Sequence, residues 1–220
     1  MREVPMSARR HQLRIRFRRL PIGVLATITT ACAFAGTAHA GLLTRSATNC
    51  PVESLGQPFM PWGDASQYTL MPGGSFEAGT PSWSLSGGAA VTSGNESFFV
   101  NSPSDTTSLS LPDGSSATSQ PVCVGINDPT LRLFAQNTGS PLSALAVSVT
   151  FQTVLGIQAT VPVSVITAGS SWEPTLPLPV VMNLLALGGQ TPITFNFTPV
   201  GPGGNWHIDD AYLDPYQRGG

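Results

Sequence analysis

Apolar and polar residues alternate along much of the chain. Between residues 145 and 152 every second position is Leu, Val or Phe, and the positions between them are Ala, Ser, Thr or Gln. This two-residue period is that of a β-strand with one buried face. The ranges 144–155 and 158–166 therefore predict a hairpin that turns at Gly156-Ile157. Further strands are predicted at 68–71, 83–85, 89–92, 97–100, 107–111, 116–120, 130–136, 191–198 and 206–213.

Turn-forming clusters rich in Gly, Pro, Asn and Asp separate these runs. Many short strands with regular turns predict an all-β fold, either a sandwich or a barrel. One segment departs from the pattern. Residues 179–187 place Val and Leu on a helical stripe, with Pro179 at its start and Gly188-Gly189 as a stop, so we expect a short helix or an apolar loop there.

The last predicted strand carries acids among bulky apolar residues. Strict alternation places Asp210 on the same side as the apolar and aromatic residues Trp206, Ile208 and Tyr212. A carboxylate on such a face needs a partner, because burying it bare is costly. We expect that partner near residues 73–77, which would bring the first and last strands together. The same alternation directs His207 and Asp209 to the opposite face, toward solvent.

The first forty residues have the layout of a secretory signal peptide. A start with seven arginines is followed by the uncharged, largely apolar run 20–35 and by the small-x-small site Ala38-His39-Ala40. We therefore expect residues 1–40 to be cleaved and the protein to be secreted, with no membrane span after cleavage. Residues 41–67, interrupted by prolines, predict an N-terminal extension in which Phe59 and Trp62 anchor on the body of the fold. The body covers 68–216 and the tail 217–220.

Charge excludes some partners. After residue 40 there are three arginines, no lysine and eleven acids, a net charge of −8. Such a surface repels phosphate groups, so nucleic acid is excluded as a partner and an anionic membrane is disfavoured.

Two cysteines remain after cleavage, Cys50 and Cys123. In an oxidising compartment an isolated pair predicts a disulfide, which would staple the extension to the body. The alternative is two buried free thiols. A zinc site is excluded, because the pair and His207, the only histidine after residue 40, do not supply four ligands.

Two motifs give the chain a resemblance to a known group. They are Gly73-Gly74-Ser75-Phe76-Glu77-Ala78-Gly79, followed by Trp83, and the closing run Trp206-His207-Ile208-Asp209-Asp210-Ala211-Tyr212-Leu213. Together they resemble the two ends of a jelly-roll carbohydrate-binding module within the broader galactose-binding-like β-sandwiches. The chain is also similar to uncharacterised secreted bacterial proteins built on this fold. The resemblance implies an antiparallel jelly-roll β-sandwich with Trp83 and Trp206 in its core.

The resemblance also implies one structural calcium ion between the first and last strands. Carried over, its ligands would be Glu77, Asp210 and a backbone carbonyl near Gly74. Calcium takes six to eight hard oxygen ligands and would neutralise both carboxylates. The alternative is a chain without calcium, in which the two acids accept N–H hydrogen bonds.

Sugar binding needs aromatic faces beside polar groups, and the sequence offers Trp172, Trp62 and Phe98 as stacking candidates. No catalytic residue is assigned, because no nucleophile elbow or phosphate-binding loop is present and nothing selects a pair of acids. We therefore expect a secreted, non-catalytic module that binds carbohydrate or a cell-envelope glycan. The alternative is a structural or interaction protein that binds another protein at the cell surface, and an enzyme ranks third.

Overall fold

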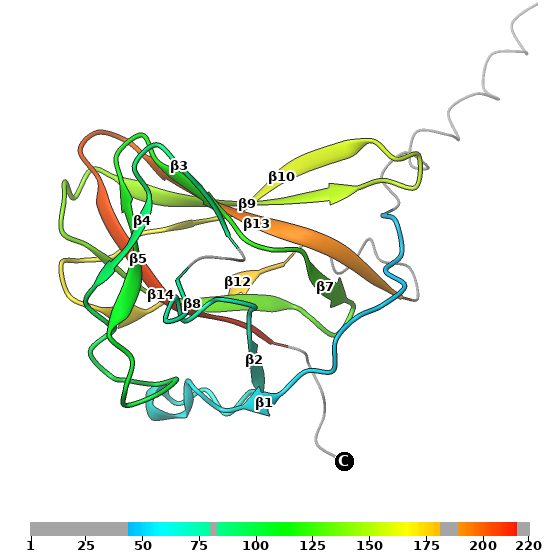
Figure 1. The fold of residues 1–220 in the computed structure, drawn as a ribbon, viewed down its shortest axis with the longest axis horizontal. Coiled ribbons are helices and arrows are strands. Elements are labelled where there is room, and N and C mark those ends of the chain that lie inside the picture. Colours follow the sequence, from blue (N-terminus) through cyan, green and yellow to red (C-terminus); the bar gives the residue numbers. More distant parts are fainter. Residues whose placement is uncertain (1–43, 80–82, 181–188, 215–220) are drawn as a thin grey trace, which may run out of the picture. The chain divides into compact units, whose positions relative to one another are not determined.

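The computed structural model describes residues 44–79, 83–180 and 189–214. The chain divides into two compact units, residues 1–37 and 38–220, and every described residue belongs to the second. The described part consists of β-strands in two antiparallel sheets and one 3-10 turn, η2 (Met60–Trp62). Figure 1 shows β9, β10 and β13 in one layer and β8 and β14 in the other. The predicted all-β antiparallel sandwich is confirmed.

The first sheet has eight strands, and β14 lies at its centre, between β8 on one side and β2 and β5 on the other. Its strands are β1 (Leu55–Gly56), β2 (Tyr68–Leu70), β4 (Ala90–Ser93), β5 (Thr107–Pro112), β8 (Thr130–Asn137), β11 (Glu173–Pro174), β12 (Leu178–Pro179) and β14 (Asn205–Asp214).

The second sheet has six strands, in which β9 pairs with both β10 and β13. Its strands are β3 (Ser84–Ser86), β6 (Ser116–Thr118), β7 (Val122–Gly125), β9 (Ala144–Gln152), β10 (Gln158–Ile166) and β13 (Gln190–Val200). The hairpin between β9 and β10 turns where it was predicted. Gly156 adopts a φ of 76°, a conformation that glycine reaches without steric cost, and Thr153 N donates to Ile157 O.

The main core lies between the two sheets, because one side of each strand is apolar. The alternating apolar residues of β8 and β9 are all less than 3% exposed, as the period predicted, and so are Ile193, Phe195 and Phe197 on β13. Trp83 and Trp206 belong to this core, as expected, and each is held by a hydrogen bond from its indole N–H. Trp83 donates to Pro72 O and Trp206 to Ser143 Oγ, so neither polar group is buried without a partner.

Some strand predictions were wrong. Residues 97–100 form no strand, because their backbone N–H groups turn inward to a carboxylate, as described below. The short strands β1, β7, β11 and β12 were not predicted, since runs of two to four residues show no period. The predicted helix or loop at 179–187 falls mostly on residues 181–188, outside the described residues. Among the described residues there is no helix long and apolar enough to cross a membrane.

The closing strand does not alternate as predicted. A bulge lies between Asp209 and Tyr212, and Asp210 has a left-handed φ of 47°. The extra residue reverses the sides that follow it. Ala211 therefore lies in the main core, whereas Tyr212 points to the outer face of the eight-stranded sheet. Asp209 is fully buried, which corrects the expectation that it faces solvent.

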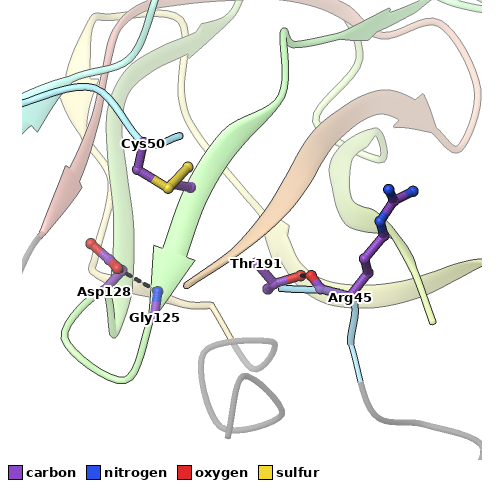
Figure 2. Close-up of a disulfide and its surroundings, with 6 residues drawn as sticks. Arg45, Cys50, Gly125, Asp128 and Thr191 are labelled. Carbon is purple, nitrogen blue, oxygen red and sulfur yellow. Dashed lines mark hydrogen bonds between the residues drawn. A yellow bond between two sulfur atoms is a disulfide. The ribbon is translucent and has the colours of Figure 1, made fainter. Parts of the chain in front are cut away.

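The described part of the N-terminal extension, residues 44–67, is fixed to the body at several points. The predicted disulfide between Cys50 and Cys123 is present and joins the extension to β7 (Figure 2). Before it, Arg45 N donates to Gln152 O and Ala47 N to Gln190 O. After it, β1 pairs with β2, and Phe59 is fully buried. We call residues 45–54 the strap.

Candidate functional site

The outer face of the eight-stranded sheet carries a row of half-buried polar and aromatic side chains. His207 on β14 pairs with Gln136 on β8 and with Ser110 on β5. Because their neighbours Trp206, Ala135 and Leu109 belong to the core, these three side chains point outward. Trp172 directly precedes β11, whose Glu173 pairs with Ala135, so it continues the row beside Gln136. Its ring lies 6.3 Å from that of His207, edge-on.

A second hydrophobic cluster covers the next part of this face. Phe59, Tyr68, Phe134 and Tyr212 are its buried members, and Trp62, Leu70, Val100 and Trp172 pack against them. Phe59 stacks on Phe134 at 5.5 Å and meets Tyr68 and Tyr212 edge-on. The extension supplies Phe59 and Trp62, so part of this aromatic cluster comes from residues outside the predicted sandwich.

The structure brings the three predicted stacking residues to this one face. Trp62 and Phe98 meet edge-on with ring centroids 4.9 Å apart, and both contact Phe134. Trp172 packs against the same cluster from the β11 side. Phe98 is 44% exposed and Trp62 and Trp172 are half-buried, so each keeps part of its ring open to a ligand. We call Trp62, Phe98 and Trp172, together with the row formed by Gln136, His207 and Ser110, the aromatic face.

An ion pair lies on the same outer face, beside the aromatic residues. Arg132 Nη1 lies 2.5 Å from Asp64 Oδ2, and its guanidinium carbon lies 4.3 Å from the centroid of Phe59. Tyr68 donates its hydroxyl to Asp64 at 2.7 Å, and Arg132 Nε donates to Thr175 O. The Asp64 carboxyl has a lowered pKa: burial acts to raise it, and its hydrogen bonds and Arg132 outweigh that effect. Sequence reasoning did not find this pair, because its members are 68 residues apart.

A buried glutamate shapes the loop that carries Phe98. Glu96 is fully buried, and its carboxylate accepts hydrogen bonds from the backbone N–H groups of Phe98 and Val100. Its own N–H donates to Asp209 Oδ2 at 3.0 Å. Nearby, Asn101 N donates to Asp210 Oδ2 at 3.1 Å. The two acids at the bulge in β14 therefore hold the loop 96–101 against the sheet.

These acids form a cluster with no basic partner among the described residues. Burial, aided by the charge of Glu96, raises the pKa of Asp209 to about 8 and that of Asp210 to about 7. Asp105 and Glu77 also raise the pKa of Asp210. The Oδ1 atom of Asp210 is buried and has no hydrogen-bond partner among the described residues. We call Glu77, Glu96, Asp105, Asp209 and Asp210 the acid cluster.

The predicted calcium ligands lie at this cluster. Gly74 contacts β14 directly: its carbonyl accepts from Ala211 N, and a Cβ there would lie 2.8 Å from Ala211 O. Glu77 Oε1 accepts hydrogen bonds from the N–H groups of Thr106 and Thr107. Burial acts to raise the pKa of Glu77, but these bonds outweigh it and the pKa is lowered. These hydrogen bonds thus hold Glu77 against the start of β5. The buried carboxylate oxygen of the cluster that lacks a described hydrogen-bond partner is Asp210 Oδ1.

The donor set fits calcium in part. Asp210 Oδ1 is an orphaned hard oxygen, and Glu77 Oε2 has only a 3.3 Å contact, from the Thr106 hydroxyl. In the parts of the chain that the structure describes, no three Asp, Glu, His or Cys side chains group closely enough to hold a metal ion unaided. A calcium ion would therefore need backbone oxygens, such as that of Gly74, to complete its ligands.

Comparison of the sequence with protein families and with curated proteins finds no match. Solved structures with a related arrangement of strands include the CBM22-1 and GH10 modules of a Clostridium thermocellum endo-1,4-beta-D-xylanase complexed with xylohexaose. That match has a TM-score of 0.49 and 13% identity, covering 65% of this chain and 28% of the xylanase chain.

Two others are isolated modules. The CBM22-1 xylan-binding domain of Paenibacillus barcinonensis Xyn10C has a TM-score of 0.45 and 14% identity, covering 66% of this chain and 93% of that domain. TmCBM61, solved in complex with beta-1,4-galactotriose, has a TM-score of 0.39 and 19% identity, covering 66% of this chain and 96% of that module. The modules found are of the class that the two sequence motifs resemble.

Proposed function

We propose that this protein is a secreted, non-catalytic module that binds a carbohydrate or a cell-envelope glycan on its aromatic face. The observation that carries the proposal is the convergence of Trp62, Phe98 and Trp172 beside the polar row formed by Gln136, His207 and Ser110. Aromatic rings stack on the apolar faces of sugar rings, and amide, imidazole and hydroxyl groups bond to sugar hydroxyls. Burial lowers the pKa of His207, so its imidazole is neutral at pH 7 and can both donate and accept.

Affinity electrophoresis through gels containing single polysaccharides tests this function. We expect at least one neutral polysaccharide to retard the mature chain. Trp172→Ala and Phe98→Ala should each weaken that binding about tenfold, the loss of roughly 1.4 kcal/mol of stacking. Leu155→Ala is the matched control, because Leu155 is 71% exposed on the β9–β10 turn, outside the aromatic face. Retardation that survives both aromatic substitutions would exclude this face as the glycan site.

The non-catalytic assignment and secretion have their own tests. A module without catalysis releases no reducing ends from the polysaccharide that it binds, even after prolonged incubation.

The Cys50–Cys123 disulfide fits an oxidising compartment. Expression of the full chain in a bacterium should give a periplasmic or extracellular product that begins at Gly41. A cell-retained product with an intact leader would contradict the proposed secretion.

We also propose that one structural calcium ion binds at Asp210, Glu77 and the Gly74 carbonyl. The orphaned Asp210 Oδ1 and the concentration of unpaired acids support it. Bound calcium would supply positive charge to these acids and link β14 to the segment between β2 and β3. Because protons compete for the same carboxylates, calcium affinity should increase between pH 5 and pH 8.

Scanning calorimetry on chelator-stripped protein tests the calcium proposal. Calcium should raise the Tm at pH 8 by several degrees and raise it less at pH 5, since ligation stabilises only the folded state. Asp210→Asn should remove most of this increment, whereas Asp113→Asn, an exposed acid on another turn, should keep it. An identical Tm with calcium and with chelator at pH 8 would rule the ion out.

A second function, binding of another protein at the cell surface, is favoured by a different feature. The turn between β9 and β10 presents Val154, Leu155 and Ile157 at 54%, 71% and 60% exposure. No charged residue occurs between Arg132 and Glu173, so this apolar tip has no charged residue along its two strands. Exposed apolar groups that gather in one place are typical of interaction sites. If Leu155→Asp abolishes binding to intact cells while polysaccharide binding persists, this function is the correct one.

A further inference from the structure

A cavity of about 600 Å³ lies between the strap and the end of the sandwich, away from the aromatic face. The strap forms one wall, and the segments 69–72 and 121–123 together with Pro192 and Leu213 form the rest. Its volume is within the range of small-molecule sites, which is about 300–1,000 Å³. Neither the glycan site nor the acid cluster contributes a residue to it.

The cavity is held open by covalent and backbone bonds on both sides of the strap. At one end Arg45 N and Ala47 N donate to the ends of β9 and β13, and Thr191 Oγ1 donates to Arg45 O at 2.8 Å (Figure 2). In the middle the disulfide ties Cys50 to β7, and at the other end β1 pairs with β2. A cavity fixed in this way exists before a ligand arrives, which reduces the entropy lost on binding.

The lining selects an apolar molecule and not a sugar. Aliphatic side chains and proline rings dominate it, and no aromatic residue is present among the described residues that line it. A sugar would therefore find no ring on which to stack. The apolar lining consists of Val52, Leu70, Met71, Val122 and Leu213 together with Pro51, Pro72, Pro121 and Pro192.

One carboxylate in the cavity has no partner. Glu53 is partly buried, and its side chain makes no hydrogen bond or ion pair with any described residue; burial raises its pKa. The negative charge of Glu53 also helps to raise the pKa of a second acid, Asp128. Asp128 is 1% exposed, and its Oδ1 atom is buried without a described partner. Among the described lining residues the only cation is Arg45, which donates to Gln152 Oε1 at 3.2 Å; Figure 2 shows its side chain directed away from the disulfide.

We infer that this cavity binds a small apolar molecule with a positively charged amine, the amine on Glu53 and the apolar body against Leu70 and the rings of Pro72 and Pro121. The unpaired acid supplies the charge that an ammonium group complements, and an ammonium would also lie in the field of Asp128. A carboxylate ligand of the same shape is repelled by the same two acids. The site is independent of glycan binding, because it shares no residue with the aromatic face.

Three probes of equal size test the inference on the mature chain: phenylbutylammonium, phenylbutanol and phenylbutanoate. Methionines labelled with ¹³C in the methyl group report binding by NMR, since Met71 lines the cavity and Met60, on η2, does not. We expect the Met71 resonance to shift with the ammonium probe at about tenfold lower concentration than with the alcohol. The carboxylate should bind most weakly, and the Met60 resonance should stay in place.

Two substitutions separate charge from shape. Glu53→Gln should make the ammonium and alcohol probes bind equally, whereas Glu173→Gln, an exposed acid on β11, should leave the tenfold preference unchanged. Thr48→Trp, at an exposed position of the strap that lines the cavity, should fill it and weaken all three probes. The inference is overturned if no probe shifts Met71, or if the wild-type chain binds the three probes equally.

Discussion

Asp209 and Asp210 occupy neighbouring positions on the closing strand but have different partners. Asp209 accepts hydrogen bonds from Glu96 N and from the N–H of Asp210, whereas Asp210 accepts one bond, from Asn101. Both acids have a pKa far above the ordinary 3.8 because they are buried away from any described cation. In the folded chain each therefore retains its proton at a pH at which the unfolded chain has lost it.

The sign of the pH dependence follows from that difference. At these two acids the folded state binds more protons than the unfolded state between pH 4 and pH 8, so their contribution to the free energy of unfolding decreases as the pH rises. We expect the chelator-stripped protein to have a higher Tm at pH 5 than at pH 8. A Tm that rises steadily over this range would show that the two acids are ionised in the folded state.

Substitution of Asp210 isolates its share of this effect. Asp210→Asn keeps an oxygen for the Asn101 N–H and removes the charge, so it should stabilise the calcium-free protein at pH 8 by roughly 1–3 kcal/mol. At pH 5 the substitution should be nearly neutral, because the wild-type acid is already protonated there. Urea unfolding of the wild type and the variant at pH 5 and pH 8 measures the change in the free energy of unfolding at each pH. Glu173→Gln is the exposed-acid control. Equal destabilisation at both pH values would contradict the assignment.

At the scale of elements, the loop 96–101 links the acid cluster to the aromatic face. Its backbone turns around the Glu96 carboxylate, which replaces the ladder hydrogen bonds that a strand would supply. Phe99 in this loop has a φ of 53°, which is unusual for a bulky residue and is held by the surrounding bonds. The loop then presents Phe98 to Trp62.

Glu96→Gln should loosen this loop. An amide offers only one acceptor oxygen, so one of the two N–H groups loses its bond, at a cost of about 1–3 kcal/mol. Hydrogen exchange at Phe98 and Val100 should accelerate, while exchange in β9 stays slow. Glycan affinity should decrease, because Phe98 is no longer held against Trp62. Unchanged exchange at both amides would show that Glu96 does not order the loop.

At the scale of the whole molecule, the disulfide connects the extension to the sandwich across 73 residues. A loop of this length corresponds to about 4 kcal/mol of stabilisation in the chain-entropy description. Cys50→Ser with Cys123→Ser should lower the free energy of unfolding by about that amount and should weaken probe binding in the strap cavity. The aromatic face should persist, since Phe59 and Trp62 are held by their own packing. Urea unfolding with and without reductant, on wild type and the double variant, measures the difference.

Many features of this molecule follow from short-range pattern. The two-residue period of residues 145–152 determines which side of β9 is buried, because side chains of a strand alternate whatever it pairs with. The two cysteines that follow the predicted leader were enough to predict the disulfide. The Gly73–Gly79 and Trp206–Leu213 motifs indicated that the first and last strands meet, and Gly74 does contact Ala211.

The sequence by itself thus determined the fold class, the core faces of the long strands and the disulfide, because each depends on local periodicity or on a unique pair. Only the tertiary structure decided the bulge at Asp210, the burial of Asp209 and the inward turn of residues 97–100. All three occur where the loop 96–101 meets β14, through bonds such as that of Glu96 N with Asp209, which lies 113 residues away. Periodicity cannot report such a contact, since one extra residue in a strand changes its register without changing its composition.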